Sequence, residues 1–407
     1  MKKFILTLAL LASTVNLAYA VDATSRDDSS AGSIVYLDND RELKVWGRFD
    51  SAIMSVDNVG TANKRATVFL NGGEKTSILG FKFKERLEDG WETGVRYDST
   101  VIPSDGSIGQ SSATGATGNF WSQYAYWYLS NPTYGKLTVG RADGVAYTVN
   151  KMSDARPGAN FGGVNTFWTD STAFGGTATA KTGMQNLSGG NQVSGILRYD
   201  SPAFAGVGIS LGYQPGGVAD NDTASTKYDY AVTYKPTEGF ARGLQAGFAQ
   251  HFGYSSAGVL NARTTIVGGN YMFLDNKANV GANYITYENP SLVKGTANSD
   301  FEQYSLSAKY FITPKWDVNG GWYKLTDNAV DTNKATQWSL GTQYYLTKRI
   351  MAYADWAQVE NKGGFGFAPF GPGAGNINSL STYYSGAMVK NPAQTISAVM
   401  VGVQVEF

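Results

Sequence analysis

The chain has 407 residues, with 33 basic against 33 acidic side chains, one histidine and no cysteine. The balanced charge gives no support to nucleic-acid binding. The lack of cysteine excludes disulfide scaffolds, thiol nucleophiles and His/Cys zinc sites. Glycine is abundant, with 49 residues, and charged residues make up 16% where about 25% is usual, so the composition favours a large sheet with tight turns.

The N-terminus "MKKFILTLALLASTVNLAYA" has the layout of a secretory signal peptide: two lysines, an apolar run from Phe4 and the small-residue end "AYA". The apolar run is shorter than the ~20 residues that a membrane-spanning helix needs. We therefore expect residues 1–20 to be removed in export. Residues 21–33 are expected to form a polar leader, and residues 34–407 a single domain.

Apolar and polar side chains then alternate along most of the chain, beginning with Leu43 and Val45 between Lys44 and Trp46. A period of two is typical of strands that have one apolar and one polar face. The predicted strands are sixteen: 41–54, 76–85, 91–99, 119–129, 134–142, 192–200, 205–214, 226–235, 242–252, 264–273, 278–287, 300–311, 316–325, 335–346, 350–360 and 394–407.

The connections between these strands alternate in length. "RLEDG", "SNPT", "LDNK" and "TPK" are short turns, whereas the intervening connections are long and polar. An even number of strands with short turns at one end and long loops at the other indicates a transmembrane β-barrel. A soluble β-sandwich or propeller is the alternative. Rows of tyrosine suit a bilayer interface better than a soluble core. The rows expected to face lipid contain Tyr124, Tyr126 and Tyr128, and Tyr228, Tyr230 and Tyr234.

The last ten residues, "AVMVGVQVEF", keep the alternation up to the terminal Phe407. In hydrocarbon an unpaired backbone N–H or C=O costs several kcal/mol, so a barrel must close on itself. We expect this tail to pair with the first strand, over about Leu43–Ile53.

Several stretches resemble the trimeric general porins of Gram-negative outer membranes, and the neisserial and betaproteobacterial branch most. They are "WGRFD", "LGFKFKERLEDGW", "YGKLTVGR", "RYDSPAFAGV", "LTKRIMAYADWAQVEN" and the closing "VGVQVEF". The resemblance covers the whole mature chain. It implies a homotrimer in contact with outer-membrane lipid and lipopolysaccharide, and a C-terminal signal that the barrel-assembly machinery recognises. That signal would comprise Val403, Val405 and Phe407.

The resemblance also implies that the third long connection, residues 142–192, folds into the barrel and narrows the channel. Its "PGANFGG" resembles a Pro-Glu-Phe-Gly-Gly turn of the family, with Asn160 where the acid usually stands. The expected constriction residues are Asp143, Lys151, Asp154, Arg156, Pro157, Asn160, Phe161, Gly162, Gly163, Asp170 and Lys181.

Charged residues on the face opposite the apolar rows would line the water-filled lumen of such a barrel. The predicted basic wall is Lys44, Arg48, Lys82, Lys84, Arg96 and Arg198, and the predicted acids are Asp50, Asp98 and Asp200. By resemblance Arg48 stands at a basic position of the family, whereas Ile78 and Gln123 replace arginines of the enteric branch. A weak preference for anions and a nearly nonselective pore with mutually paired charges both remain open.

The function that these features indicate is a general diffusion porin, which passes ions and small hydrophilic solutes passively. The alternatives are a channel selective for organic acids or sugars, and a barrel that serves as an adhesin or structural anchor. Trp46 and Trp127 are the expected inward aromatics, too few for a sugar track. A hydrolase built on Glu85, Glu88 and Glu92 has no supporting motif. No catalytic residue, cofactor or metal is expected, and His251 is expected near the surface as a girdle residue.

Overall fold

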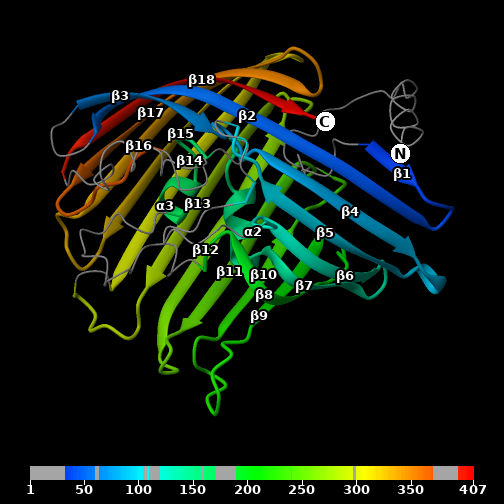
Figure 1. Cartoon of the computed structure of the whole chain (residues 1–407). Coiled ribbons are helices and arrows are strands. Elements are labelled where there is room, and N and C mark those ends of the chain that lie inside the picture. Colours follow the sequence, from blue (N-terminus) through cyan, green and yellow to red (C-terminus); the bar gives the residue numbers. More distant parts are fainter. Residues whose placement is uncertain are drawn as a thin grey trace.

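The computed structural model describes residues 33–59, 64–103, 106, 108–109, 120–156, 160–169, 189–239, 241–296, 299–369 and 393–407. These residues form one antiparallel sheet that closes on itself (Figure 1). The predicted signal peptide and all but the last residue of the predicted leader lie outside the described residues. No helix in the described part of the chain is long and apolar enough to cross a membrane.

Eighteen strand segments, two α-helices and one 3-10 turn make up the described structure. They are β1 (Ser33–Tyr36), β2 (Arg41–Val59), β3 (Lys64–Asn71), β4 (Ile78–Arg86), η1 (Glu88–Gly90), β5 (Glu92–Thr100), β6 (Tyr124–Asn131), β7 (Gly135–Asp143), α2 (Val145–Met152), α3 (Asn165–Thr169), β8 (Gln192–Asp200), β9 (Val207–Gln214), β10 (Lys227–Tyr234), β11 (Leu244–Tyr254), β12 (Leu260–Phe273), β13 (Ala278–Glu288), β14 (Asp300–Thr313), β15 (Trp316–Asp327), β16 (Lys334–Tyr345), β17 (Ile350–Lys362) and β18 (Thr395–Glu406).

The eighteen segments form a barrel of sixteen strands, as the alternation predicts. β2 pairs with β4 along its first half and with β3 along its second half, so β3 and β4 are one strand interrupted at residues 72–77. On the other side of β2, the short β1 continues the line of β18. β9 pairs with β10, which completes the ring.

β3 was not predicted, and its outward row mixes the polar Arg65 and Thr67 with the apolar Phe69. Phe69 is exposed on the outside, while Ala66 and Leu70 are buried inside against Met54 and other apolar side chains. The inward row of Ala66, Val68 and Leu70 is apolar, so the polar lumen-facing row that marks the other strands is missing here. The remaining predicted strands are all present, with shifted ends.

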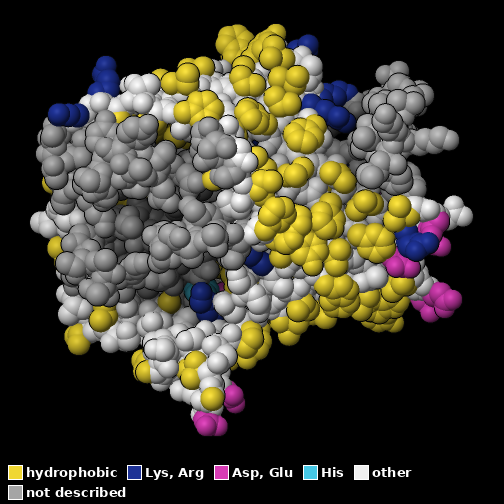
Figure 2. Space-filling model, viewed as in Figure 1, with side chains coloured by type: hydrophobic (Ala, Val, Ile, Leu, Met, Phe, Trp, Pro, Cys, Tyr) yellow, Lys and Arg dark blue, Asp and Glu magenta, His cyan; other side chains and the backbone are white. Residues whose placement is uncertain are grey.

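The outer surface is apolar. Ile53, Leu340 and Val401 are about 60% exposed, whereas their chain neighbours Ala52 and Met400 are buried inside. Figure 2 shows hydrophobic side chains gathered over the surface that β2, β4 and β5 form. Such an exposed apolar surface is stable where it meets lipid rather than water.

The tail closes the barrel to its last residue. Val401 lies opposite Ile53, and the terminal Phe407 donates its N–H to Gly47 O at 3.0 Å and accepts the Gly47 N–H at 2.8 Å. Figure 1 shows β18 beside β2. The pairing covers Arg48–Val56 rather than the predicted Leu43–Ile53, because β1 occupies the edge of β2 at Glu42–Val45.

The connections alternate broadly as predicted. Residues 87–91, 132–134, 274–277, 314–315 and 346–349 form short turns at one end of the barrel. The other end carries the long connections, of which residues 144–191 and 363–394 are the longest. Two connections at that end are also short: residues 60–63 and 255–259.

Candidate functional site

The inner wall between β4 and β8 carries cations interleaved with aromatic rings. The Arg96 guanidinium carbon lies 4.3 Å from the ring centre of Tyr124 and 5.2 Å from that of Trp46. Arg96 also forms an ion pair with Asp98 at 2.7 Å. A cation over an aromatic face gains about 0.5–2 kcal/mol, depending on its exposure. The rings therefore hold this charge in place as well as filling space.

Two lysines share one ring on the same wall. Lys136 Nζ is 4.6 Å and Lys82 Nζ is 5.1 Å from the ring centre of Tyr128. The Tyr128 ring lies across Gly94 of β5, where an added Cβ would come within 2.8 Å of it. The Tyr128 hydroxyl donates to Glu92 at 2.8 Å.

These tyrosines correct the expected orientation of β6. Tyr124, Tyr126 and Tyr128 point inward, and Trp127, expected inside, is 41% exposed on the outer face. β6 has aromatic residues in both of its alternating rows, so aromatic content alone did not identify the lipid-facing row. The other predicted row is right: Tyr228, Tyr230 and Tyr234 are exposed.

Other predicted wall residues are held in ion pairs. Arg198 pairs with Asp200 at 2.8 Å and donates to Asp143 O at 3.0 Å. The remaining pairs join Lys84 to Glu42 at 2.9 Å and Arg48 to Glu406 at 3.6 Å. Lys44 lies opposite Lys82 in the β2–β4 register. The predicted acids Asp98 and Asp200 thus lie beside the bases instead of forming a row of their own.

Asp50 is buried and does not face the lumen water as predicted. Its carboxylate accepts the backbone N–H of Gly73 at 2.9 Å and of Lys75 at 2.8 Å, and the hydroxyl of Tyr353. Asp50 therefore fixes residues 72–77, the interruption between β3 and β4. Backbone N–H donors satisfy this buried charge, which is the condition for burying it at all.

The described part of the connection after β7, residues 144–156 and 160–169, follows the opposite inner wall strand by strand. α2 contacts β10, β11 and β12, as Figure 1 also shows. Three side chains then hold the chain beyond it in succession: Asn270 of β12 donates to Met152 O, Asn283 of β13 to Ser153 Oγ at 2.8 Å, and Ser307 Oγ of β14 accepts the N–H of Ala155 at 2.8 Å.

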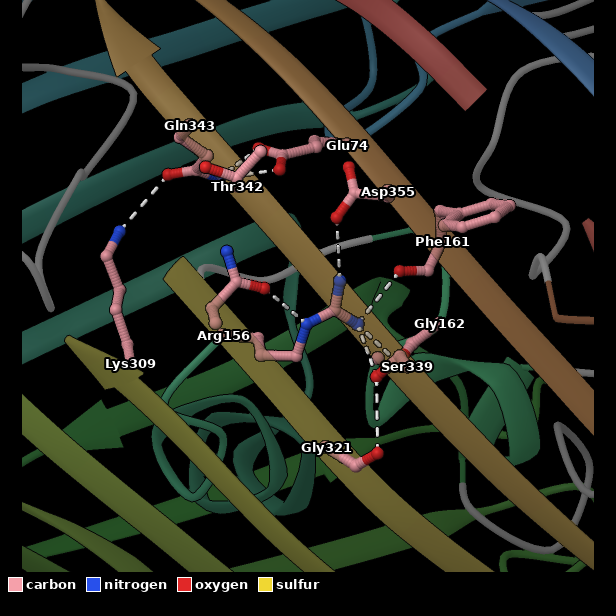
Figure 3. Close-up of polar contacts among 12 residues, drawn as sticks. Glu74, Arg156, Phe161, Gly162, Lys309, Gly321, Ser339, Thr342, Gln343 and Asp355 are labelled. Atoms are coloured by element: carbon pink, nitrogen blue, oxygen red, sulfur yellow. Dashed lines mark hydrogen bonds and ion pairs between the residues drawn. The ribbon is translucent and has the colours of Figure 1, made fainter. Parts of the chain in front are cut away.

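Arg156 is the centre of the next contacts, on β15 to β17 (Figure 3). Its guanidinium binds Asp355 at 3.0 Å, Asn319 at 2.8 Å and Ser339 at 3.0 Å, and it also donates to the carbonyls of Phe161 and Gly162. Both members of the Arg156–Asp355 pair are almost fully buried. One side chain thus joins two parts of the connection to three strands.

The other predicted constriction residues have structural partners where they are described. Asp154 accepts the Tyr323 hydroxyl at 2.9 Å and the Val164 N–H at 2.9 Å. Gln337 donates to Gly163 O at 3.3 Å, and Asn160 N donates to Glu74 O at 2.7 Å. Lys151 is exposed on α2. Pro157, Asp170 and Lys181 lie outside the described residues.

Glu74, which the sequence did not single out, reaches from residues 72–77 to the same wall. Its carboxylate accepts Gln343 Nε2, and Gln343 Oε1 in turn accepts Lys309 Nζ at 3.1 Å (Figure 3). Lys309 pairs with Asp317 at 2.8 Å. No periodicity in the sequence marks this glutamate, because it lies between strands.

His251 is buried, so its expected place near the surface is wrong. It is 1% exposed and pairs with Asp229, whose other oxygen accepts the Val145 N–H at 3.3 Å. Alternation places His251 and Asp229 on inward rows, where they meet the start of α2. This pair therefore attaches α2 to the wall.

The three residues of the predicted assembly signal lie at the outer surface of β18 or at its end. Val403 is 43% and Phe407 52% exposed. Gly47 leaves space for the Phe407 ring, since an added Cβ would lie 2.3 Å from it. Recognition of Val403, Val405 and Phe407 by the assembly machinery stays a prediction. In the described part of the chain, no three His, Cys, Asp or Glu side chains are grouped as metal ligands would be.

Comparisons with known proteins agree with this architecture. A comparison with curated proteins found no match by sequence. Three solved structures align over 100% of their own chains: an anion-selective porin from Comamonas acidovorans (TM-score 0.69, 19% identity, 90% of this chain), OmpT expressed in the outer membrane of Vibrio cholerae (0.59, 13%, 92%) and OmpF of Salmonella typhi in complex with daunomycin (0.58, 16%, 92%). At these identities the similarity concerns the fold.

A family model gives the more specific result. The model of the Gram-negative porins matches residues 7–364, which is most of the chain. The closed barrel, its apolar outside and its polar inside are what such a channel requires. The chain therefore belongs to the Gram-negative porin family, whose members form channels through the outer membrane.

Proposed function

We propose that this protein is a general diffusion porin, which passes ions and small hydrophilic solutes passively and with a weak preference for anions. One observation supports this most: the described part of the connection after β7 is bound to the inner wall from β12 to β17, opposite the basic wall of β4 to β8. A segment held against one side narrows the lumen without closing it.

Passage through such a channel keeps the solute hydrated. A barrel of sixteen strands is wide enough for an aqueous lumen, so an ion crosses it without losing all of its water. Asp154, Arg156 and Asn160 have partners within the protein, which makes them positioning residues of the constriction rather than solute contacts.

The anion preference follows from the charges on the basic wall. The inward cations there and on the adjoining β2 are Lys44, Lys82, Lys84, Arg96, Lys136 and Arg198, and the inward acids are Glu42, Glu92, Asp98 and Asp200. The cations outnumber the acids, and excess charge of one sign lowers the entry barrier for its counter-ion. The ion pairs that Lys84, Arg96 and Arg198 form with acids keep the effect weak. The structurally similar porin from Comamonas acidovorans is described as anion-selective.

The assembly we propose is a homotrimer in the outer membrane, where it contacts lipid and lipopolysaccharide. We also propose that residues 1–20 are removed during export and that the barrel-assembly machinery inserts the chain. One Vibrio cholerae OmpT structure is described as a trimer. The packed outer rings of Phe81, Tyr97 and Trp121 form an apolar surface that could be shared between subunits. Cross-linking in native membranes tests this: a ladder ending at three subunits is expected, and a monomer alone contradicts it.

Single-channel recording of the purified protein in a planar bilayer tests the function. We expect ohmic conductance in potassium chloride and a reversal potential displaced towards chloride in a salt gradient. Lys82→Glu should move the reversal potential towards potassium, because it replaces a wall cation by an acid. Absence of conductance would refute the channel, and an unchanged reversal potential in this variant would remove Lys82 from the ion path.

A further inference from the structure

The interruption between β3 and β4 is an insertion near the middle of the barrel wall. Opposite residues 72–77, β2 has only Phe49 and Asp50. Asp50 is the middle residue of β2, which runs over Arg41–Val59. Backbone groups that turned outward at this height would stay unpaired in lipid, so an insertion here has to turn into the lumen. Gly72 begins the turn with a φ of 105°, a conformation that glycine adopts without strain.

The insertion lies across the inner faces of several strands. Gly73 packs against Tyr353 of β17, since an added Cβ would lie 2.1 Å from the tyrosine hydroxyl. The Tyr353 ring lies in turn on Gly402 of β18, where an added Cβ would lie 2.3 Å from it. Glu74 then reaches β16, where its carboxylate accepts Gln343 Nε2 (Figure 3). The insertion thus extends from β3 and β4 past β2, β18 and β17 to β16.

The connection after β7 touches this insertion at residues 160–162. Asn160 N donates to Glu74 O at 2.7 Å, and Asn160 Nδ2 donates to Thr76 Oγ1 at 3.3 Å. On the other side, Arg156 binds the carbonyl oxygens of the two residues that follow Asn160. This part of the connection is therefore bound both to the wall strands, through Arg156, and to the insertion.

Glu74 makes both of the contacts that locate the end of the insertion. Its side chain accepts from Gln343, while its carbonyl oxygen accepts from Asn160. Glu74 is 1% exposed, so it acts on the channel through its neighbours and not by touching a solute. A buried carboxylate that loses its donor is costly to keep in place. Loss of the Gln343 contact should therefore shift Glu74 and, with it, Asn160.

We propose that residues 72–77 form a second inward element of the constriction, and that Glu74 is the positioning residue that sets the channel width through Asn160. The constriction is then built from two segments that lie far apart in the sequence and meet in the lumen. Its width depends on the junction between them as well as on the wall contacts of Arg156. This inference rests on the proposed diffusion channel and names a further residue for its size limit.

The test measures osmotic swelling of liposomes that contain the protein, in a neutral monosaccharide and in a neutral tetrasaccharide. The ratio of the two rates reports the channel width and does not depend on how much protein has assembled. Glu74→Ala should raise the tetrasaccharide-to-monosaccharide ratio about two-fold or more, because passage of a neutral solute depends on pore diameter. Glu74→Gln should keep the wild-type ratio, because the amide oxygen can accept the same hydrogen bond.

Gln343→Ala tests the same contact from its other side. This variant and the double variant with Glu74→Ala should both show the ratio of Glu74→Ala alone, because two residues of one contact are not additive. Glu88→Ala removes an exposed carboxylate in the turn of η1 and should keep the wild-type ratio. If Glu74→Ala does not assemble, Gln343→Ala decides the question by itself.

Two results would overturn the role of Glu74 and leave the channel standing: a wild-type ratio in Gln343→Ala, or an equal rise of the ratio in Glu88→Ala. A wild-type protein that gives no swelling even with the monosaccharide would refute the channel itself.

Discussion

The two inner walls of this barrel use different side chains, and the difference matches what each wall contacts. The wall of β12 to β16 presents amides and hydroxyls, such as Asn270, Asn283, Ser307, Asn319 and Gln343, and it holds a chain segment. The wall of β4 to β8 presents lysines and arginines over tyrosines. An amide both donates and accepts, so it can satisfy a passing backbone. Ammonium and guanidinium groups only donate, which suits them to anions.

The contacts between the chain segment and the wall of β12 to β17, here called the amide wall, should depend most on Arg156. Arg156→Met leaves Asp355 buried without its cation, and breaking one side of a buried pair costs about 3–5 kcal/mol. We expect a lower midpoint of thermal unfolding in detergent and a larger, noisier single-channel conductance, because the segment loses its anchor.

The control for this prediction is Arg65→Met, which removes an arginine that pairs with Asp57 on the surface, where it is 70% exposed. It should leave both the unfolding midpoint and the conductance as in wild type, because exposed ion pairs contribute little. Equal behaviour of the two variants would mean that Arg156 does not hold the segment.

The cation–tyrosine wall should be most sensitive at Gly94. An added Cβ would lie 2.3 Å from Phe83 O and 2.8 Å from the Tyr128 ring, and the backbone cannot yield as a side chain would. Gly94→Ala should destabilise the barrel by about 1–3 kcal/mol, the usual cost of overpacking, and should displace the tyrosine. Unfolding midpoints in detergent measure this.

Gly208→Ala, at a glycine of β9, is the matched control. Its added Cβ would meet only Thr233 Oγ1, at 3.3 Å, so we expect a small change. If Gly94→Ala were as well tolerated as this control, close packing of Tyr128 over β5 would be refuted.

The barrel could be predicted from the sequence because a period of two is a local property. The alternation of apolar and polar residues predicted the face on which most side chains lie, the number of strands and the pairing of the C-terminal tail with the first strand. Prediction failed where the usual contrast between the two rows is lost: the inward row of β3 is apolar, and β6 has aromatics in both rows. The short-range pairs Arg96–Asp98 and Arg198–Asp200 lie two residues apart on one face, a spacing that could have revealed them.

The sequence by itself therefore determined the fold class and most of the residues that share the inner surface. Only the tertiary structure decided which of them meet. Arg156 and Asp355, Glu74 and Gln343, and Lys82 and Tyr128 come together because closure of the barrel and the register of its strands bring distant segments side by side. Alternation fixes the direction of a side chain, but its partner across the lumen depends on the whole ring of strands.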